Sequence, residues 1–276
     1  MMSFGARLDD ALSVRGSLCV GIDPHTSLLS AWGLSDDALG LARFADTCVE
    51  AFGGLAAVIK PQSAFFEVYG SAGISVLERT VSGAQSAGAL VLLDVKRGDI
   101  GSTMDAYARA YLDPASPLAV DAITASPFLG VGSLDPAFER ATASGRGVFV
   151  LAATSNPEGP QVQHAVTTAG VSVAQTVVDE VTRRNADARP LGSFGVVAGA
   201  TIGAGAPTFD ALNGPILAPG IGAQGGTSDD VRRVFGGATR NVIPSVSREV
   251  LRAGPSVPAL REVAERLVAE YAFLRA

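Results

Sequence analysis

The fold is decided by the stretch Leu90-Val91-Leu92-Leu93-Asp94-Val95-Lys96-Arg97-Gly98-Asp99-Ile100, in which an apolar run passes directly into charged residues. The run at 90–93 is typical of a fully buried strand, where ionised side chains are costly unless they are paired. Asp94 and Lys96 lie two residues apart, so on a strand their side chains face the same way. Asp99 falls beyond the strand, in a turn that Gly98 opens. The pattern predicts an acid, a base and a second acid at the exit of a buried strand, where α/β enzymes carry their chemistry.

Similar apolar runs recur along the whole chain and alternate with helical patterns. Seven further strands are predicted, at residues 17–24, 55–62, 118–126, 147–155, 194–201, 215–220 and 241–245. The intervening segments have helical spacing; one helix is predicted to be capped by Ser35, and a short one is predicted near 209–212. Eight strand–helix units favour a parallel sheet closed into one (β/α)8 TIM barrel over residues 1–276. An open doubly wound sheet is the alternative, and the lack of G-x-G-x-x-G after the first strand counts against it.

Composition and charge narrow the function classes. The net charge of −6 gives no general attraction to nucleic acid or to an anionic membrane. The sequence contains no apolar stretch long enough to span a bilayer and no secretory signal pattern, so a cytoplasmic protein is predicted. Cys19 and Cys48 are expected to be buried free thiols. His25 and His164 lie too far apart in sequence to favour a zinc site or a histidine-based triad.

Polar residues occur at the carboxyl ends of the predicted strands, which is the face that carries the active site in barrel enzymes. They are Asp23, Lys60, Asp94, Lys96, Ser126, Ser155, Thr201 and Gln224. Several residues of mixed charge after apolar runs favour one shared site. A simple ion pair between Asp94 and Lys96 that caps the barrel stays open as the alternative.

A second informative stretch is Pro219-Gly220-Ile221-Gly222-Ala223-Gln224-Gly225-Gly226. Glycines let the backbone approach a ligand and present N–H groups to an anion. Arg248 follows the eighth predicted strand, and the loops after strands seven and eight are the usual phosphate site of this barrel. A phosphate-binding site is therefore predicted, against the alternative of a flexible glycine loop and a solvated arginine.

The motif Asp94-x-Lys96-x-x-Asp99-Ile100-x-x-Thr103 resembles the signature of the orotidine 5′-phosphate decarboxylases. Residues 21–24, 60–62, 65–67, 153–157 and 219–226 are similar to the longer bacterial subgroup of that family, which includes mycobacterial enzymes. The resemblance implies a carbon–carbon lyase that converts orotidine 5′-monophosphate into UMP and CO2 in de novo pyrimidine synthesis. It also implies that the reaction uses neither a metal nor an organic cofactor.

The resemblance further assigns roles to individual residues. The implied catalytic residues are Lys60, Asp94, Lys96 and Asp99, with Lys96 delivering a proton to C6. The implied substrate-binding residues are Asp23 and Lys60 at the ribose, Ser155 at the pyrimidine, Gln224 and Arg248 at the phosphate, and also Pro219, Ile100 and Thr103. Asp99, Ile100 and Thr103 would reach into the partner subunit's site, so the resemblance implies a homodimer with shared active sites.

Two other functions stay open at this point. The first is a related Mg²⁺-dependent sugar-phosphate decarboxylase or aldolase barrel, in which an acid at the end of the second strand holds the metal. Lys60 takes that position here and would repel a cation. The second is a non-catalytic barrel that only binds a nucleotide, and Lys96 disfavours it because binding alone does not require that residue.

Overall fold

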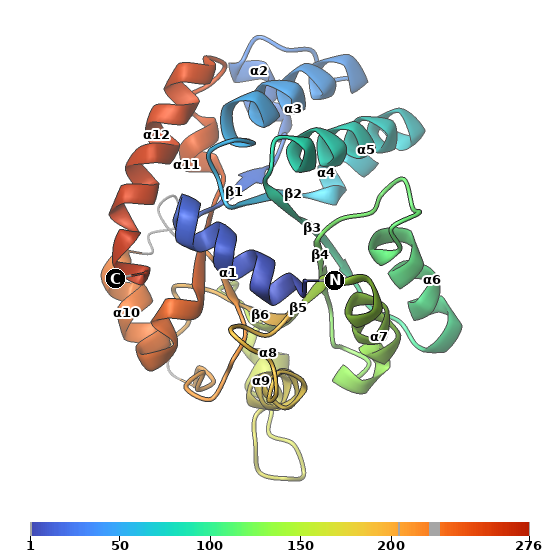
Figure 1. Cartoon of the computed structure of the whole chain (residues 1–276), viewed down its shortest axis with the longest axis vertical. Helices are drawn as coiled ribbons and strands as arrows, with labels where there is room; N and C mark the ends of the chain where they lie inside the picture. Colours follow the sequence, from blue (N-terminus) through green and yellow to red (C-terminus); the bar gives the residue numbers. More distant parts are fainter. Residues whose placement is uncertain (1, 204, 221–226, 276) are drawn as a thin grey trace.

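Eight parallel strands close into a barrel in the order of the chain, which confirms the predicted (β/α)8 architecture. The computed structural model describes residues 2–203, 205–220 and 227–275. The strands are β1 (Cys19–Ile22), β2 (Val58–Pro61), β3 (Leu90–Arg97), β4 (Ala122–Ala125), β5 (Gly147–Ala153), β6 (Phe194–Ala198), β7 (Ile216–Pro219) and β8 (Val242–Val246). Figure 1 looks into the ring that these strands form inside a layer of helices.

The helices cover the outside of the barrel, with short ones in the loops. They are α1 (Phe4–Arg15), α2 (Thr26–Ala31), α3 (Ala38–Phe52), α4 (Ser63–Glu67), α5 (Gly70–Ser86), α6 (Gly101–Leu112), α7 (Asp135–Ser144), α8 (Pro160–Gln163), α9 (Val173–Arg184), α10 (Ser228–Phe235), α11 (Arg248–Leu251) and α12 (Val257–Glu270). Three 3₁₀ turns, η1 (Val131–Leu134), η2 (Gly236–Asn241) and η3 (Ala272–Leu274), complete them.

Strand alternation divides the core into two clusters and sets the direction of the site residues. Along β3, Val91 and Leu93 pack outward against the helices, whereas Leu90 and Leu92 belong to the cluster that fills the barrel. Because side chains alternate along a strand, Asp94 continues the inward series. Both faces of the strand are thus buried, and the first charged side chain lies directly above the filled interior.

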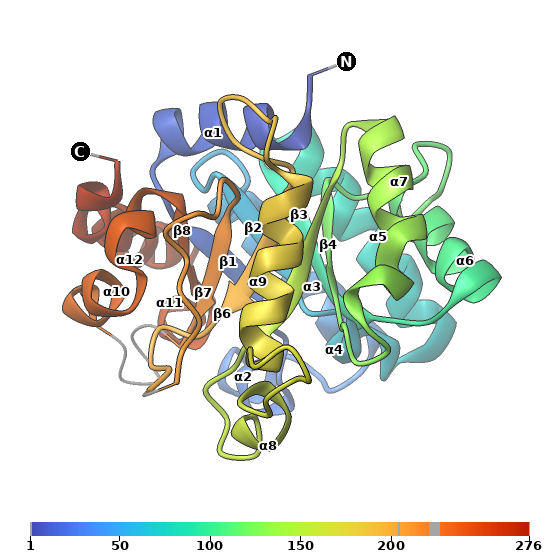
Figure 2. The same cartoon turned by 90° about the horizontal axis from the view of Figure 1, so that it is seen from below.

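Helix α1 closes the amino-terminal end of the barrel, and the sequence reasoning did not predict it. Its buried residues Phe4, Leu8 and Leu12 belong to the inner cluster. Phe4 lies edge-on to Phe149, with 6.1 Å between the ring centroids. In Figure 2 this helix lies at the opposite end of the barrel from α2 and α8. The carboxyl ends of the strands are therefore left as the open face.

Two local predictions were wrong. Residues 209–212 do not form a helix; they form a turn that buries Phe209 and Leu212 in the outer cluster. Helix α3 is capped by Asp37 rather than by Ser35, because the Asp37 carboxylate accepts hydrogen bonds from the N–H groups of Leu39 and Gly40. Ser35 Oγ donates to the same carboxylate at 2.8 Å, so it supports the cap. Among the described residues, none of the helices has the length and apolar character needed to cross a bilayer.

Candidate active site

A cavity of about 580 Å³ opens at the carboxyl ends of the strands. Its charged lining residues are Asp23, Lys60, Asp94, Lys96 and Arg248. They come from β2, β3 and the segments that follow β1 and β8. Apolar side chains such as Leu151, Val197 and Leu217 form its floor, continuous with the core of the barrel. The predicted shared site at this face is therefore present as a single cavity.

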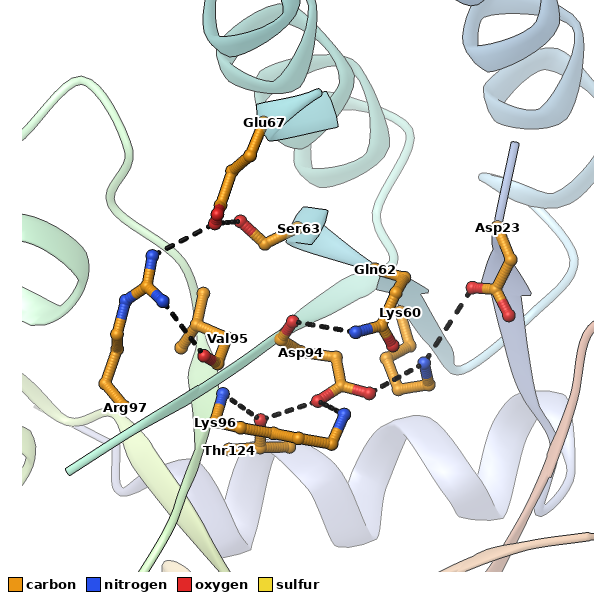
Figure 3. A network of polar contacts seen from close by, with 10 residues as sticks. All are labelled: Asp23, Lys60, Gln62, Ser63, Glu67, Asp94, Val95, Lys96, Arg97 and Thr124. Carbon is orange, nitrogen blue, oxygen red and sulfur yellow. Dashed lines mark hydrogen bonds and ion pairs between the residues drawn. The ribbon is translucent and has the colours of Figure 1, made fainter. Parts of the chain in front are cut away.

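Four of these side chains form a continuous array of alternating charge, drawn in Figure 3. Lys96 Nζ lies 2.7 Å from Asp94 Oδ1, and Lys60 Nζ lies 3.3 Å from Asp94 Oδ2. Lys60 Nζ is also 4.0 Å from Asp23 Oδ1. Asp94 thus bridges the two ammonium groups, which makes the array more than the isolated Asp94–Lys96 pair considered from the sequence.

The array fixes the charge state of its buried members. Burial alone would lower the pKa of Lys60, but the Asp23 and Asp94 carboxylates outweigh it and raise that pKa above its ordinary value. Burial would likewise raise the pKa of Asp94, but the Lys60 and Lys96 ammonium groups lower it. Lys60 is therefore charged at neutral pH although its side chain is only 8% exposed.

An irregularity in β3 brings Lys96 over Asp94. Lys96 has a φ of 45°, and it is the only non-glycine residue with a positive φ in the part of the chain that the structure describes. The pairing of β3 with β4 shifts register between Leu93 and Arg97. Arg97 turns the other way and donates to Glu67 Oε1 at 3.0 Å. The bulge thereby separates the adjacent cations Lys96 and Arg97, and of these two only Lys96 lines the cavity.

Sequence reasoning missed several polar residues that hold the array. Thr124 Oγ1 donates to Asp94 Oδ1 at 2.7 Å, and Gln62 Nε2 donates to the Asp94 carbonyl at 3.4 Å. Ser247 Oγ donates to Asp23 Oδ2 at 2.5 Å, while Asp23 Oδ1 is buried and accepts no hydrogen bond from the described residues. His25, which the sequence did not connect with a zinc site or a triad, lines the cavity and packs on Phe65, with ring centroids 4.2 Å apart.

One feature of the composition could have identified the site earlier. Lys60 and Lys96 are the only two lysines in the chain, although lysine and arginine together number 21. Both lysines line the same cavity. Arginine supplies all the remaining side-chain cations, so both compact ammonium groups of the chain lie at one site.

Only some of the other residues predicted at the strand ends and in the loops after them line the cavity. Ser155, Pro219, Gly220 and Arg248 line the cavity, and Arg248 is the first residue of α11. Gln224 and the rest of 221–226 lie outside the described residues. The predicted strand-end residues Ser126 and Thr201 are not part of the lining; Ser126 directly follows β4, and Thr201 lies in a turn after β6.

Asp99, Ile100 and Thr103 do not line the cavity of their own chain. Asp99 and Ile100 precede α6, and Thr103 lies in its first turn. The Ile100 side chain is 62% exposed, and Thr103 is also exposed. Their position on the outside of the barrel, beside the β3 exit, leaves them free to contact another molecule.

The described residues contain no group of three or more His, Cys, Asp or Glu side chains arranged to hold a metal ion. The acids nearest the cavity, Asp23 and Asp94, are each close to the Lys60 ammonium. An ammonium between two carboxylates occupies the position that a cation would need. The chemistry available to the chain's own residues is therefore electrostatic stabilisation and proton transfer.

The fold and this cavity define a (β/α)8-barrel enzyme with a lysine–carboxylate site at the carboxyl ends of its strands. The family model described as "Orotidine 5′-phosphate decarboxylase / HUMPS family" matches residues 16–263. The chain belongs to this family, as the sequence motif predicted.

Individual relatives extend the likeness over nearly the whole chain. The chain is 62% identical over 270 residues to the orotidine 5′-phosphate decarboxylase of Salinispora arenicola, covering 98% of this chain and 97% of that protein. It is 59% identical to the Streptomyces coelicolor enzyme, with the same coverage. A crystal structure from Streptomyces avermitilis, assigned as an orotidine 5′-phosphate decarboxylase, superposes with a TM-score of 0.97 at 59% identity. The match covers 100% of this chain and 96% of that one.

Proposed function

We propose that this protein decarboxylates orotidine 5′-monophosphate to UMP and CO2, a step of pyrimidine biosynthesis. The observation that carries the proposal is the Asp23–Lys60–Asp94–Lys96 array at the open end of the barrel. Relatives that are 62% identical over nearly the full chain bear the name of this enzyme, which favours the decarboxylase over other members of the family.

The chemistry requires a cation beside the carbon that loses CO2. When the bond between C6 and the carboxylate breaks, its electron pair stays on C6, where no carbonyl is placed to delocalise it directly. A fixed ammonium stabilises that developing charge, and Lys96 then transfers a proton from Nζ to C6 as the general acid. CO2 leaves, UMP retains the new C6–H bond, and Lys96 recovers its proton from solvent.

The other charged residues hold Lys96 and the substrate in place. Asp94 holds the Lys96 ammonium in place through the 2.7 Å contact, and Lys60 balances the second oxygen of Asp94. In the family role carried by the motif, Asp94 also lies near the substrate carboxylate, and that repulsion would favour CO2 loss. Asp99 would complete the array from the partner subunit.

The remaining cavity residues fit the other parts of the nucleotide. We assign the ribose hydroxyls to Asp23 and Lys60, because both residues line the cavity and Asp23 Oδ1 is a buried acceptor that receives no hydrogen bond from the described residues. Ser155 is assigned to the pyrimidine edge. The phosphate is assigned to Arg248 with Pro219 and Gln224 along the seventh loop. Phosphate binding there would contribute binding energy remote from C6, and this energy can organise the charged groups.

We also propose that the enzyme works as a homodimer with shared active sites. Exposed apolar side chains occur on the loops that follow β3 and β4, namely Ile100, Phe128 and Leu129. These loops are neighbours, because the Ser126 N–H donates to the Arg97 carbonyl at 2.8 Å. Apolar groups gathered on one face are typical of an association surface. Thr103, one turn into α6, would reach the partner's ribose site from this face.

Independence from metals and organic cofactors is part of the proposal, and a cytoplasmic location stays a prediction. Activity should persist in EDTA, because the ammonium groups supply the positive charge that a cation would otherwise supply. Complete loss of turnover in EDTA would favour the Mg²⁺-dependent alternative. Binding of UMP without any turnover of orotidine 5′-monophosphate would favour the non-catalytic barrel.

The direct test is the Lys96→Ala variant. The parent protein should release CO2 from orotidine 5′-monophosphate and form UMP, whereas the variant should lose at least ~10²-fold in kcat, the low end for a positioned proton donor. The loss of UV absorbance during substrate conversion measures the rate for the parent and the variant, and chromatography identifies the UMP that forms.

A matched control removes a cation elsewhere. Arg79→Ala deletes a guanidinium of α5 that is paired with Asp46 on the surface, and it should keep the parent rate. Turnover by Lys96→Ala at the rate of this control would remove Lys96 from its catalytic role.

A further inference from the structure

The bulge in β3 has a single counterpart on β4. Leu93 is paired with Ile123 and Arg97 with Ala125, so Asp94, Val95 and Lys96 on one strand lie opposite Thr124 alone on the other. Because three residues of β3 face one residue of β4, some backbone groups of the bulge lack the hydrogen-bond partners that regular strand pairing would give them. The bulge therefore needs a substitute hydrogen bond from a side chain.

The Thr124 hydroxyl supplies this bond and a second one. It accepts the Lys96 backbone N–H at 2.9 Å and donates its own proton to Asp94 Oδ1 at 2.7 Å. The same Oδ1 receives the Lys96 ammonium at 2.7 Å. One buried hydroxyl, only 1% exposed as a residue, thus connects the backbone of Lys96 to the carboxylate that binds its side chain.

We propose that Thr124 is a positioning residue, which holds Lys96 in its left-handed conformation and Asp94 in the rotamer that bridges the two lysines. Without the hydroxyl, the Lys96 N–H loses its acceptor, and the backbone can relax from φ 45° toward the ordinary β region. The ammonium would then move from its place over Asp94. This inference rests on the proposed function only for its kinetic consequence, since the contacts themselves lie within the chain.

Two substitutions separate the hydroxyl from the bulk of the side chain. Thr124→Val keeps the shape and removes the hydroxyl, whereas Thr124→Ser keeps the hydroxyl and removes a methyl group. For Val we expect kcat to fall roughly tenfold to hundredfold, the range for losing a hydrogen bond to a charged group, with KM changed by less than about threefold because Asp94 and Lys96 act in the chemical step. Ser should stay within about threefold of the parent in both constants.

A spectroscopic measurement follows the same contact without using turnover. Since the chain has only two lysines, protein labelled with [¹⁵N]lysine should show two lysyl backbone amide signals, and Lys60→Arg assigns the one that remains to Lys96. Thr124→Val should shift the Lys96 signal, and Thr124→Ser should keep it near the parent position. Thr124→Ala gives a second hydroxyl-free variant should Val fail to fold, with the same expectation.

The outcomes are distinct. An unmoved Lys96 amide signal in the hydroxyl-free variants, or a Ser variant as slow as Val, would overturn the role of the Thr124 hydroxyl. Failure of the parent protein to convert orotidine 5′-monophosphate would instead overturn the proposed function, and the amide shift would still decide whether Thr124 holds Lys96.

Discussion

Lys96 is held in a backbone conformation that a non-glycine residue adopts only when its surroundings require it. A residue in the left-handed region costs on the order of 1–3 kcal/mol, and Lys96 has φ 45° at the exit of β3. The hydrogen bond from its N–H to Thr124 and the ion pair to Asp94 offset this cost. The strain thus occurs at the residue that the proposed reaction uses most directly.

Lys60 is the second residue of the array that gives a prediction. Its removal should lower the free energy of unfolding by an amount that depends on pH. Lys60→Met leaves the buried Asp94 carboxylate and the half-buried Asp23 carboxylate without their common ammonium, so we expect the free energy of unfolding at pH 7 to fall by about 3–5 kcal/mol. In the parent, the Lys60 and Lys96 ammonium groups lower the pKa of Asp94 against the effect of burial. A carboxyl group whose pKa is lower in the folded state than in the unfolded state, where it is about 3.9, stabilises the fold at pH values above the unfolded-state pKa. This stabilisation is lost as the pH falls through the folded-state pKa.

The difference in free energy of unfolding between the parent and Lys60→Met should therefore be largest at neutral pH. It should shrink as the pH approaches about 4, where carboxyl groups take up protons. Urea unfolding at pH 7 and at pH 4 measures it. Lys60→Arg, which retains the charge, is the matched control and should lose less at pH 7. An equal loss for Met at both pH values would contradict the electrostatic explanation.

At the scale of elements, the strands were predictable because each is a short apolar run with a polar residue at its end. The carboxyl ends of parallel strands meet on one face, so Lys60, Asp94 and Lys96 could be brought together before any coordinates were known. The bulge in β3 could not be predicted, because its register depends on pairing with β4, a separate strand whose alignment the sequence does not give. Thr124 was missed for the same reason, since its function exists only opposite the bulge.

Helix α1 was missed for a different physical reason. Its buried large apolar residues, Phe4, Leu8 and Leu12, are few, and the apolar Val14 lies on the exposed face, so the segment has a weak amphipathic pattern. It is stabilised by packing across the bottom of the barrel, which is a tertiary effect. The ring of Phe4 also fits only because residue 147 is a glycine: a Cβ there would lie 2.4 Å from Phe4 Cδ1.

This packing predicts that α1 contributes to stability and not to catalysis. Phe4→Ala should lower the free energy of unfolding by about 3–5 kcal/mol, the usual loss for a buried phenylalanine. It should leave kcat and KM unchanged at a temperature where the variant is folded, because α1 lies at the amino-terminal end of the barrel (Figure 2), whereas the cavity is lined by residues at the carboxyl ends of the strands. Val14→Ala on the same helix is the control, since Val14 is 83% exposed; it should change stability by no more than about 0.5 kcal/mol. A large fall in kcat for folded Phe4→Ala would show that the two ends are coupled.

At the scale of the whole molecule, the motif of β3 and its following turn is divided between two directions. Asp94 and Lys96 line the cavity, whereas Asp99, Ile100 and Thr103 lie outside it. The homodimer that we propose would account for this division, because each chain would lend Asp99 to its partner. In that arrangement a subunit separated from its partner keeps the lysine array and loses activity.

Mixing two inactive variants tests this arrangement. Lys96→Ala and Asp99→Ala should each have low activity alone. In a mixed dimer, one site combines the intact Lys96 of one chain with the intact Asp99 of the other, so random exchange of subunits should restore about a quarter of the parental sites. Mixing Lys96→Ala with the Lys96→Ala, Asp99→Ala double variant should restore none, because no site then has Lys96. If Asp99 served its own chain, both sites of every mixed dimer would lack one of the two residues, and the first mixture would stay as inactive as the second. Activity after exchange therefore distinguishes a residue lent across the interface from one that acts where its own barrel places it.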